Sequence, residues 1–386
     1  MPSLSSHLLD RIRQLIATPS VSSVSPQFDQ SNRAVIDLLA EWLEASGFAV
    51  RIEPLPGRSD KANLIATLGE GPGGLVLAGH TDTVPFDAGR WRYDPFGGTV
   101  ADERIYGLGS ADMKSFLALA IEAAREFSAR DLRQPLVILA TADEESSMGG
   151  ARALAAAGQP LGRHAVIGEP TGLRPVRMHK GILMEAIRLE GRSGHSSNPA
   201  LGASALEGMH QVIGELLRWR TELQARYRNP LFEVDVPTLN LGRIHGGDNP
   251  NRICADCELH IDIRPLPGMA LAELRDVLHQ RLGHLLSDGE LKLSFEPLFP
   301  GIEALETPAA AAIVQAAEDL TGAPAGVVGF GTEGPYFNAL GMETVILGPG
   351  SVDCAHQPDE FLPLATLQPT LDLLRGLIGQ FCVEPE

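Results

Sequence analysis

Metal-capable side chains follow four apolar segments of the chain, each at the point where the segment ends. LVLAG leads into His80, VILATAD into Glu144 and Glu145, AVIG into Glu169, and VILGPGSVDCA into His356. A further acid, Asp112, lies in the loop 107–114, just before an apolar helical pattern. Imidazole nitrogens combined with carboxylate oxygens suit zinc, cobalt or manganese better than a metal that prefers thiolates. The residue types therefore indicate a metal site.

The charge of this set favours two ions. The carboxylates of Asp112, Glu145 and Glu169 would leave one positive charge beside two divalent cations, and a single bridging hydroxide would neutralise it. A pair of ions held in this way is typical of hydrolases. Taken singly, the same residues have ordinary interpretations, because a histidine after a strand is usually a turn residue and the acidic run 143–145 is usually a solvated turn. Their shared position at strand ends outweighs those interpretations.

The elements that must bring these residues together alternate between strands and helices. Helical spacing of apolar residues covers 8–17, 32–45, 116–127 and 371–381, whereas short apolar runs at 48–55, 63–68, 75–78, 136–140, 165–167 and 344–347 predict strands. This order predicts an α/β fold with a helix-covered, mostly parallel sheet. Ligand sites in such sheets lie outside the carboxyl ends of the strands, so the scattered residues should converge there.

The pattern changes between residues 181 and 295. A strand at 182–189, a long amphipathic helix at 204–226 and alternation over 252–264 predict an antiparallel sheet with one wet face, covered by two helices. We expect an inserted α+β domain at 181–295 that interrupts an α/β domain formed by 1–180 and 296–386. The alternation also points Cys254 and Cys257 to opposite faces, which argues against a thiolate metal site.

Length and composition limit the class of partner. The chain has 386 residues, 44% hydrophobic and 21% charged, enough for two domains with sizeable cores. Its net charge of −18 disfavours nucleic acid and anionic membrane surfaces as partners. We find no uncharged apolar run of about 20 residues and no signal-peptide core. Four cysteines are too few for a disulfide framework, so we expect a cytoplasmic protein.

Six ordered motifs along the whole chain carry a family resemblance. They are GHTDTVP at 79–85, GLGSADMK at 107–114, ADEE at 142–145, GEP at 168–170, SGHSS at 193–197 and AHQP at 355–358. With these motifs the sequence resembles the dizinc amidohydrolases, the metallohydrolase family that includes succinyl-diaminopimelate desuccinylases, aminoacylases and glutamate carboxypeptidases. The resemblance implies two divalent ions per chain, with zinc expected and cobalt as the alternative.

The resemblance also implies a role for each residue of the metal site. His80 and Glu169 would hold one ion, Glu145 and His356 the other, and Asp112 would bridge both opposite a water or hydroxide. Glu144 would be the general base that activates this water and then protonates the leaving amine. Asp82 would orient the imidazole of His80. Family members also have a cis peptide bond after the bridging aspartate, here Asp112–Met113, and usually a glycine where this chain has Ser115.

Residues of the inserted domain complete the expected site. By the resemblance, a partner subunit or a closed lid places His195 over the scissile carbonyl to stabilise the oxyanion, which implies a homodimer. Arg264 is the best placed donor for a substrate carboxylate, although a surface ion pair with Asp262 or Glu258 is an equally good interpretation. The other candidates for substrate binding are Lys180, Asn251 and Thr332, together with Glu333 as an acid for a distal ammonium group.

Longer phrases at 140–148, 178–181, 251–255 and 347–351 narrow the expected substrate. Within the family they are most similar to bacterial enzymes that hydrolyse N2-acetyl-L-ornithine to L-ornithine and acetate in arginine biosynthesis. An acidic protein suits a substrate with a cationic side chain. The alternatives are the same chemistry on acetylcitrulline, succinyl-diaminopimelate or a broad range of N-acetyl amino acids, and a scaffold that has lost its metals and acts as a binding module. Specificity of this kind depends on a few pocket contacts.

Overall fold

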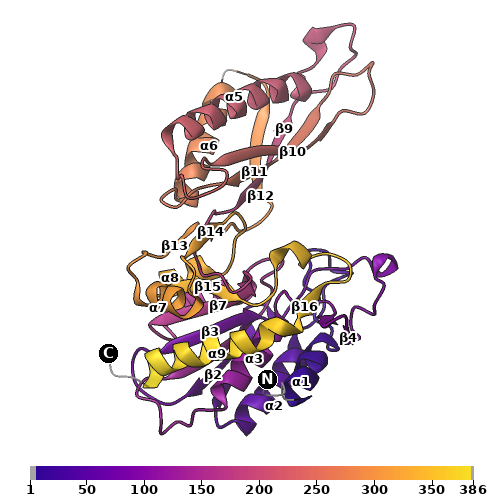
Figure 1. Ribbon diagram of the computed structural model, residues 1–386. Helices are drawn as coiled ribbons and strands as arrows, with labels where there is room; N and C mark the ends of the chain where they lie inside the picture. The colour runs from indigo at the N-terminus through magenta and orange to yellow at the C-terminus, as the bar shows by residue number, and fades with distance from the viewer. Residues whose placement is uncertain (1–5, 288, 384–386) are drawn as a thin grey trace. The chain divides into compact units, whose positions relative to one another are not determined.

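The computed structural model describes residues 6–287 and 289–383 (Figure 1). The chain divides into two compact units. The first unit comprises Met1–Arg177, Thr307–Gly326 and Glu333–Glu386, and the second comprises Met178–Glu306 and Val327–Thr332. The expected insertion at 181–295 falls within the second unit. Residues 1–5, 288 and 384–386 of the two expected domains lie outside the described residues.

A large sheet forms the centre of the first unit. In spatial order its strands are β1 (Ala49–Leu55), β2 (Arg58–Leu68), β6 (Leu136–Thr141), β3 (Leu75–His80), β7 (His164–Pro170) and β15 (Glu343–Gly348). β6, β3, β7 and β15 pair in parallel, and β1 and β2 extend the sheet in antiparallel fashion. β8 (Val176–His179) pairs with β15 through Val176. The short strand β13 (Leu305–Glu306) belongs to the second unit and pairs there with Met178 and His179 at the end of β8. β14 (Gly326–Val328) also pairs with β8. The expected helix-covered, mostly parallel α/β sheet is confirmed.

Helices cover this sheet. α1 (Ser6–Ile16), α2 (Arg33–Ala45), α3 (Lys114–Ala124), α7 (Ala312–Thr321) and α9 (Leu367–Ile378) share one hydrophobic core with the sheet. α3 packs between α1 and α9, and its alanine- and leucine-rich sequence is buried on almost every side (Figure 1). α4 (Gly149–Ala157) and α8 (Gly334–Ala339) contact each other. α3 is therefore a rigid support for Asp112, which lies two residues before it.

A small three-stranded sheet connects two segments that are distant in the sequence. β16 (Phe361–Pro363) pairs with β5 (Arg104–Tyr106), which pairs with β4 (Thr99–Ala101). Phe361 lies opposite Tyr106 in this register. The segment that follows His356 is therefore fixed to the segment that precedes Asp112.

The second unit has its own antiparallel sheet, with strand order β10 (Thr238–Gly246), β11 (Asp256–Arg264), β9 (Leu183–Glu190) and β12 (Lys292–Pro297). α5 (Ala205–Arg226) and α6 (Leu271–Leu285) share a hydrophobic core with it. Every second residue of β11 is buried, as the alternation predicted. The strand begins at Asp256 rather than at Arg252, because Ile253 and Cys254 pair with other segments: the Ile253 N–H donates to the Gly194 carbonyl, and the Cys254 carbonyl accepts from Ala205.

Within the described part of the chain, none of the helices combines the length and the apolar character that crossing a membrane requires.

Candidate active site

The predicted metal ligands of the first unit lie together at one edge of the large sheet. His80 is the last residue of β3, Glu144 and Glu145 follow β6, and Glu169 is the penultimate residue of β7. Because β6, β3 and β7 are neighbours and run parallel, their carboxyl ends meet. His356 follows β15, the next strand along. The sheet therefore brings together residues that are up to 276 positions apart in the sequence, from 80 to 356.

Asp112 divides its two carboxylate oxygens between two histidines. Oδ1 lies 3.0 Å from Nε2 of His80, and Oδ2 lies 3.4 Å from Nε2 of His356. Nε2 of His356 also lies 3.1 Å from Oε1 of Glu145. Nε2 of His80 also lies 3.8 Å from Oε1 of Glu169. The peptide bond between Asp112 and Met113 is cis. A carboxylate placed in this way has one oxygen for each of two adjacent ions.

Two groups of ligand atoms are compact enough to hold a metal ion. His80, Glu144 and Glu169 form one, and His80, Asp112 and Glu145 form the other, with the ligand atoms of each group within 4.8 Å of one another. Glu144 is 9% exposed and Glu169 is 6% exposed. The nitrogen and oxygen donors fit zinc or a similar divalent ion. The described residues thus contain a candidate metal-binding group.

The electrostatics of the cluster also favour bound cations. Burial raises the pKa of Glu144 well above its usual range, and the charge of Glu169 raises it further. Burial and the charge of Asp112 raise the pKa values of Glu145 and Glu169. Burial alone would lower the pKa of His80, but its contacts with Asp112, Glu169 and Asp82 raise it well above normal. Divalent ions would relieve this repulsion between buried carboxylates.

Asp82 is fully buried beside His80, one of the predicted metal ligands. Nδ1 of His80 lies 2.9 Å from the backbone carbonyl oxygen of Asp82 and 3.8 Å from its carboxylate. That carboxylate accepts hydrogen bonds from the backbone N–H groups of Glu144, at 3.2 Å, and Glu145, at 3.0 Å. Asp82 therefore contacts both His80 and the turn that carries the expected base.

A lysine network behind the same turn was not predicted from the sequence. Lys61 is fully buried, and its Nζ donates to Asp143 at 2.6 Å and to Asp29 at 2.9 Å. Asp143 has a left-handed backbone, φ 58°, and also accepts a hydrogen bond from the Ser22 hydroxyl. The network fixes the residue immediately before Glu144. A lysine in the apolar pattern of β2 was the only sequence signal for it.

Glu360, also missed by the sequence reasoning, contacts the loop that carries Asp112. Its carboxylate accepts hydrogen bonds from the backbone N–H groups of Gly109, Ala111 and Asp112. Burial and the charge of Asp112 raise the pKa of Glu360 to about 8, whereas these hydrogen bonds act in the opposite direction.

Glu333 lies in the first unit and is 1% exposed. The Thr141 hydroxyl, at the end of β6, donates to its Oε2 at 2.9 Å, and burial raises its pKa to about 7. The neighbouring Thr332 belongs to the second unit, where its backbone N–H donates to Nε2 of the buried His179. Both side chains are enclosed by protein in this structure.

The remaining candidates lie in the second unit. Arg264 donates from Nε to both oxygens of Asp262, at 3.0 and 3.1 Å. Lys180 donates to the carbonyl oxygens of Val234 and Val236, each at 2.7 Å. Asn251 is exposed. Arg264 therefore makes the ion pair that was its alternative interpretation, and Lys180 is held by backbone.

His195 is exposed on a loop of the second unit. Its Nδ1 accepts hydrogen bonds from the backbone N–H of Ser197 at 3.2 Å and pairs with the Ser197 hydroxyl at 2.7 Å. Because a backbone N–H can only donate, the neutral ring carries its proton on Nε2. In this tautomer Nε2 is a hydrogen-bond donor.

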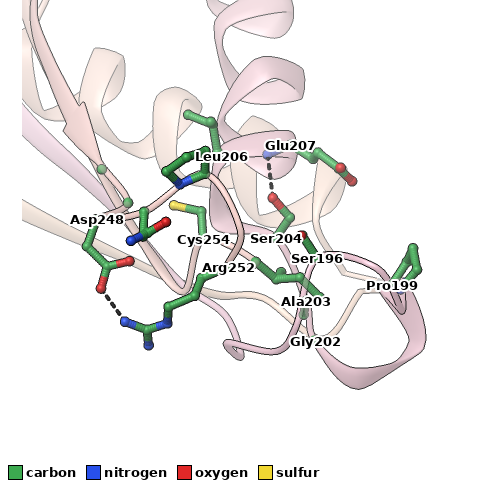
Figure 2. A pocket seen from close by; sticks show the side chains of 15 residues that line it. Ser196, Pro199, Gly202, Ala203, Ser204, Leu206, Glu207, Asp248, Arg252 and Cys254 are labelled. Atoms are coloured by element: carbon green, nitrogen blue, oxygen red, sulfur yellow. Dashed lines mark hydrogen bonds and ion pairs between the residues drawn. The ribbon is translucent and has the colours of Figure 1, made fainter.

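A pocket of about 720 Å³ lies beside this loop, also within the second unit (Figure 2). Its lining includes Ser196, Ser204, Glu207, Arg252 and Cys254. Arg252 pairs with Asp248, and the Ser204 hydroxyl accepts from the Glu207 N–H at the start of α5 (Figure 2). None of the predicted metal ligands lines this pocket.

Together, the fold and the site indicate a class of protein: an α/β metallohydrolase with a candidate metal-binding group at the carboxyl edge of its sheet. Residues 76–380 match the family model described as peptidase family M20/M25/M40. The chain belongs to this family of amide-bond hydrolases, which confirms the family resemblance found in the sequence.

Two bacterial relatives are similar over almost their whole length. An acetylornithine deacetylase of Proteus mirabilis (strain HI4320) is 51% identical over 375 residues, covering 97% of each chain. An acetylornithine deacetylase of Edwardsiella ictaluri (strain 93-146) is 52% identical over 370 residues, covering 96% of each chain.

Solved structures share the fold at lower identity. An M20 family metallo-carboxypeptidase of Sulfolobus solfataricus is 17% identical with a TM-score of 0.74, covering 97% of this chain and 99% of that one. A Bacillus subtilis protein described as a dinuclear metal-binding peptidase of the M20 family is 15% identical with a TM-score of 0.68, covering 96% of each chain.

Proposed function

We propose that this protein is a metal-dependent deacetylase that hydrolyses N2-acetyl-L-ornithine to L-ornithine and acetate. The observation that carries the reaction class is the geometry of Asp112, whose oxygens face His80 and His356 with Glu144 alongside. The substrate is inferred from the two relatives of that name, which are about half identical over nearly the full chain. The reaction would supply ornithine for arginine biosynthesis in the cytoplasm.

The ligand cluster would hold two divalent ions, zinc by expectation and cobalt as the alternative. His80 and Glu169 would bind one, Glu145 and His356 the other, and Asp112 would bridge them. When bound, such ions lower the pKa of a water molecule and polarise the acyl carbonyl. Asp82 would keep both His80 and the turn 144–145 in place through the contacts described above.

Glu144 would act as the general base and then as the general acid. Its pKa is raised by burial and by Glu169 in the metal-free cluster, and nearby cations would lower it again and keep the carboxylate ionised. It could then take a proton from the attacking water. The same proton would pass to the leaving amine nitrogen as the amide C–N bond breaks.

The second unit would provide the remaining functions of a lid and a dimerisation domain. We infer that Nε2 of His195 donates a hydrogen bond to the oxyanion that develops on the acyl oxygen, and that it comes from the partner subunit of a homodimer. Its tautomer supports this role, because Nδ1 is already engaged by Ser197. Residues 181–295 would form this domain, and 1–180 with 296–386 the catalytic domain.

Substrate recognition would draw on Arg264, Asn251, Lys180 and Thr332, with Glu333 as the acid for the distal ammonium group. Arg264 must exchange its contact with Asp262 for the substrate carboxylate, and Lys180 must leave two carbonyl oxygens. These residues are therefore expected to rearrange when substrate binds.

Amine release from N2-acetyl-L-ornithine, N2-acetyl-L-citrulline and succinyl-diaminopimelate, measured side by side, tests the proposal. The protein is stripped with a chelator and assayed before and after addition of zinc or cobalt. We expect metal-restored turnover with the highest kcat/KM on acetylornithine. A preference for another substrate would overturn the substrate assignment, and activity on none would overturn the proposed reaction.

A further inference from the structure

Glu360 is a buried carboxylate whose hydrogen-bond partners all belong to one loop. Its side chain is 1% exposed. Oε1 accepts from the backbone N–H groups of Ala111 at 2.8 Å and Asp112 at 3.0 Å, and Oε2 accepts from Gly109 at 3.1 Å. One carboxylate thus accepts from three backbone N–H donors of the loop 107–114, including that of Asp112 itself.

The backbone around Glu360 is fixed to the same loop. The carbonyl of Glu360 accepts from the N–H of Gly107 at 2.9 Å, and β16, which begins at Phe361, pairs with β5 immediately before the loop. Gly109 has φ +81°, a left-handed conformation that turns its N–H toward the carboxylate. Position and orientation of the loop are therefore both set by the segment 360–361.

The same short segment carries His356, which contacts Asp112 from the other side. Nε2 of His356 lies 3.4 Å from Oδ2 of Asp112, four residues before Glu360 in the chain. The backbone of Asp112 is held by Glu360, and its carboxylate faces His356. Any shift of the loop would move the carboxylate oxygens of Asp112 relative to His80 and His356.

We propose that Glu360 is a positioning residue for the bridging carboxylate: it holds the backbone of Asp112 so that both carboxylate oxygens keep their places between His80 and His356. This role rests on the proposed dimetal function. An uncharged amide in place of the carboxylate would keep the volume but set an N–H₂ group against at least one backbone N–H, leaving a buried donor unsatisfied. Partners of metal ligands typically affect metal affinity or activity by about 10- to 100-fold.

The test compares Glu360→Gln with Asp359→Asn, a matched change one residue away. The Asp359 carboxylate also accepts hydrogen bonds from two backbone N–H groups, those of Arg92 and Tyr93. Neither of these two residues is a predicted metal ligand. Asn tolerates the left-handed backbone of position 359, φ 59°. Zinc affinity is measured by chelator competition, kcat and KM by amine release, and the melting temperature on metal-free protein.

For Glu360→Gln we expect at least one zinc ion to bind about tenfold or more weakly, and kcat to fall about 10- to 100-fold with KM changed less than kcat. The melting temperature of the metal-free variant should fall, because a buried donor is left unsatisfied, and zinc affinity is therefore measured at a temperature at which the variant is folded. The zinc affinity of Asp359→Asn should match that of the unchanged protein. Wild-type zinc affinity in Glu360→Gln, or losses equal to those of Asp359→Asn, would overturn the proposal.

Two further arms keep the test decisive. If Glu360→Gln does not fold, Glu360→Asp replaces it. This variant keeps the charge and withdraws the carboxylate oxygens by one methylene. Unchanged zinc affinity in Glu360→Asp would then overturn the proposal.

The second arm concerns the unchanged protein. If it binds two ions but hydrolyses none of the acyl amino acids, the proposed function fails. The zinc affinities of the variants still decide the role of Glu360.

Discussion

Among single residues, one carboxylate of the candidate metal cluster, Glu144, is proposed to move the proton in bond cleavage. Glu144 and Glu169 both lie within reach of His80, but Glu145 and Asp112 are the acids in contact with His356. Glu169 also forms an ion pair with His80, so we assign the movement of the proton to Glu144. Changing Glu144 separates metal binding from catalysis.

We predict that Glu144→Gln lowers kcat by about 10²- to 10⁴-fold, because the amide cannot take a proton from water. The variant should still bind two zinc ions with an affinity near that of the unchanged protein, as measured by elemental analysis after dialysis. Glu44→Gln, on the exposed side of α2, is the control and should leave both values unchanged. Loss of metal together with activity would contradict the assignment of Glu144 as the base.

The sequence predicted that the metal-capable residues lie at strand ends, because each of them follows a short apolar run that is typical of a buried strand. His80, Glu145 and Glu169 were expected at strand ends, and the structure brings them together. The contacts of Glu360 could not be predicted, since it accepts from Gly109, 251 positions away, through backbone N–H groups that have no sequence signature. Lys61 was hidden for a similar reason, as a charge in a strand is usually exposed.

At the scale of elements, the turn 143–145 depends on a lysine from β2. Lys61 is fully buried between Asp29 and Asp143. Removing its charge would leave Asp143, whose side chain is 8% exposed, without its cationic partner, whereas Asp29 would keep its ion pair with Arg58. Burial opposes the charged form of Lys61, but both carboxylates raise its pKa above the usual value. The ion pair between Lys61 and Asp143 therefore connects β2 to the turn 143–145.

We predict that Lys61→Met lowers the free energy of unfolding by about 3–5 kcal/mol, the usual cost of leaving a buried charge without its partner. It should also lower kcat, because the turn that carries Glu144 loses its support. Lys292→Met is the matched control: its exposed ion pair with Glu190 should contribute no more than about 1 kcal/mol. Urea unfolding followed by circular dichroism gives both values, and equal midpoints would refute the role of Lys61.

Element boundaries were harder to predict than element types. The alternation over 252–264 identified a strand correctly, yet β11 starts at Asp256 because the preceding residues bond to the His195 loop and to α5. β8, β13 and β14 did not appear in the sequence pattern, since strands of two to four residues are too short to show a period.

At the scale of the whole molecule, the proposed homodimer places His195 of one chain at the metal site of the other. We predict that mixing Glu144→Gln with His195→Ala restores activity although each variant alone is nearly inactive. A heterodimer would contain one site with both an intact base and an intact histidine, so random exchange of subunits should return about a quarter of the normal activity.

The mixture is assayed for amine release after subunits have been allowed to exchange, with each variant incubated alone as the control. Each variant should retain its metal, which excludes loss of ions as the cause of inactivity. Mixtures that stay as inactive as the separate variants, although subunit exchange is demonstrated, would show that His195 does not act on a partner's site.

A zinc titration tests whether the ligand cluster of the first unit holds two ions and hydrolyses an acyl amino acid. Chelator-stripped protein receives zinc in steps, while bound metal per chain and turnover of N2-acetyl-L-ornithine are recorded on the same samples. We expect no turnover without metal and full turnover as about two ions bind per chain. Turnover that persists in metal-free protein, or two bound ions without hydrolysis, would contradict it.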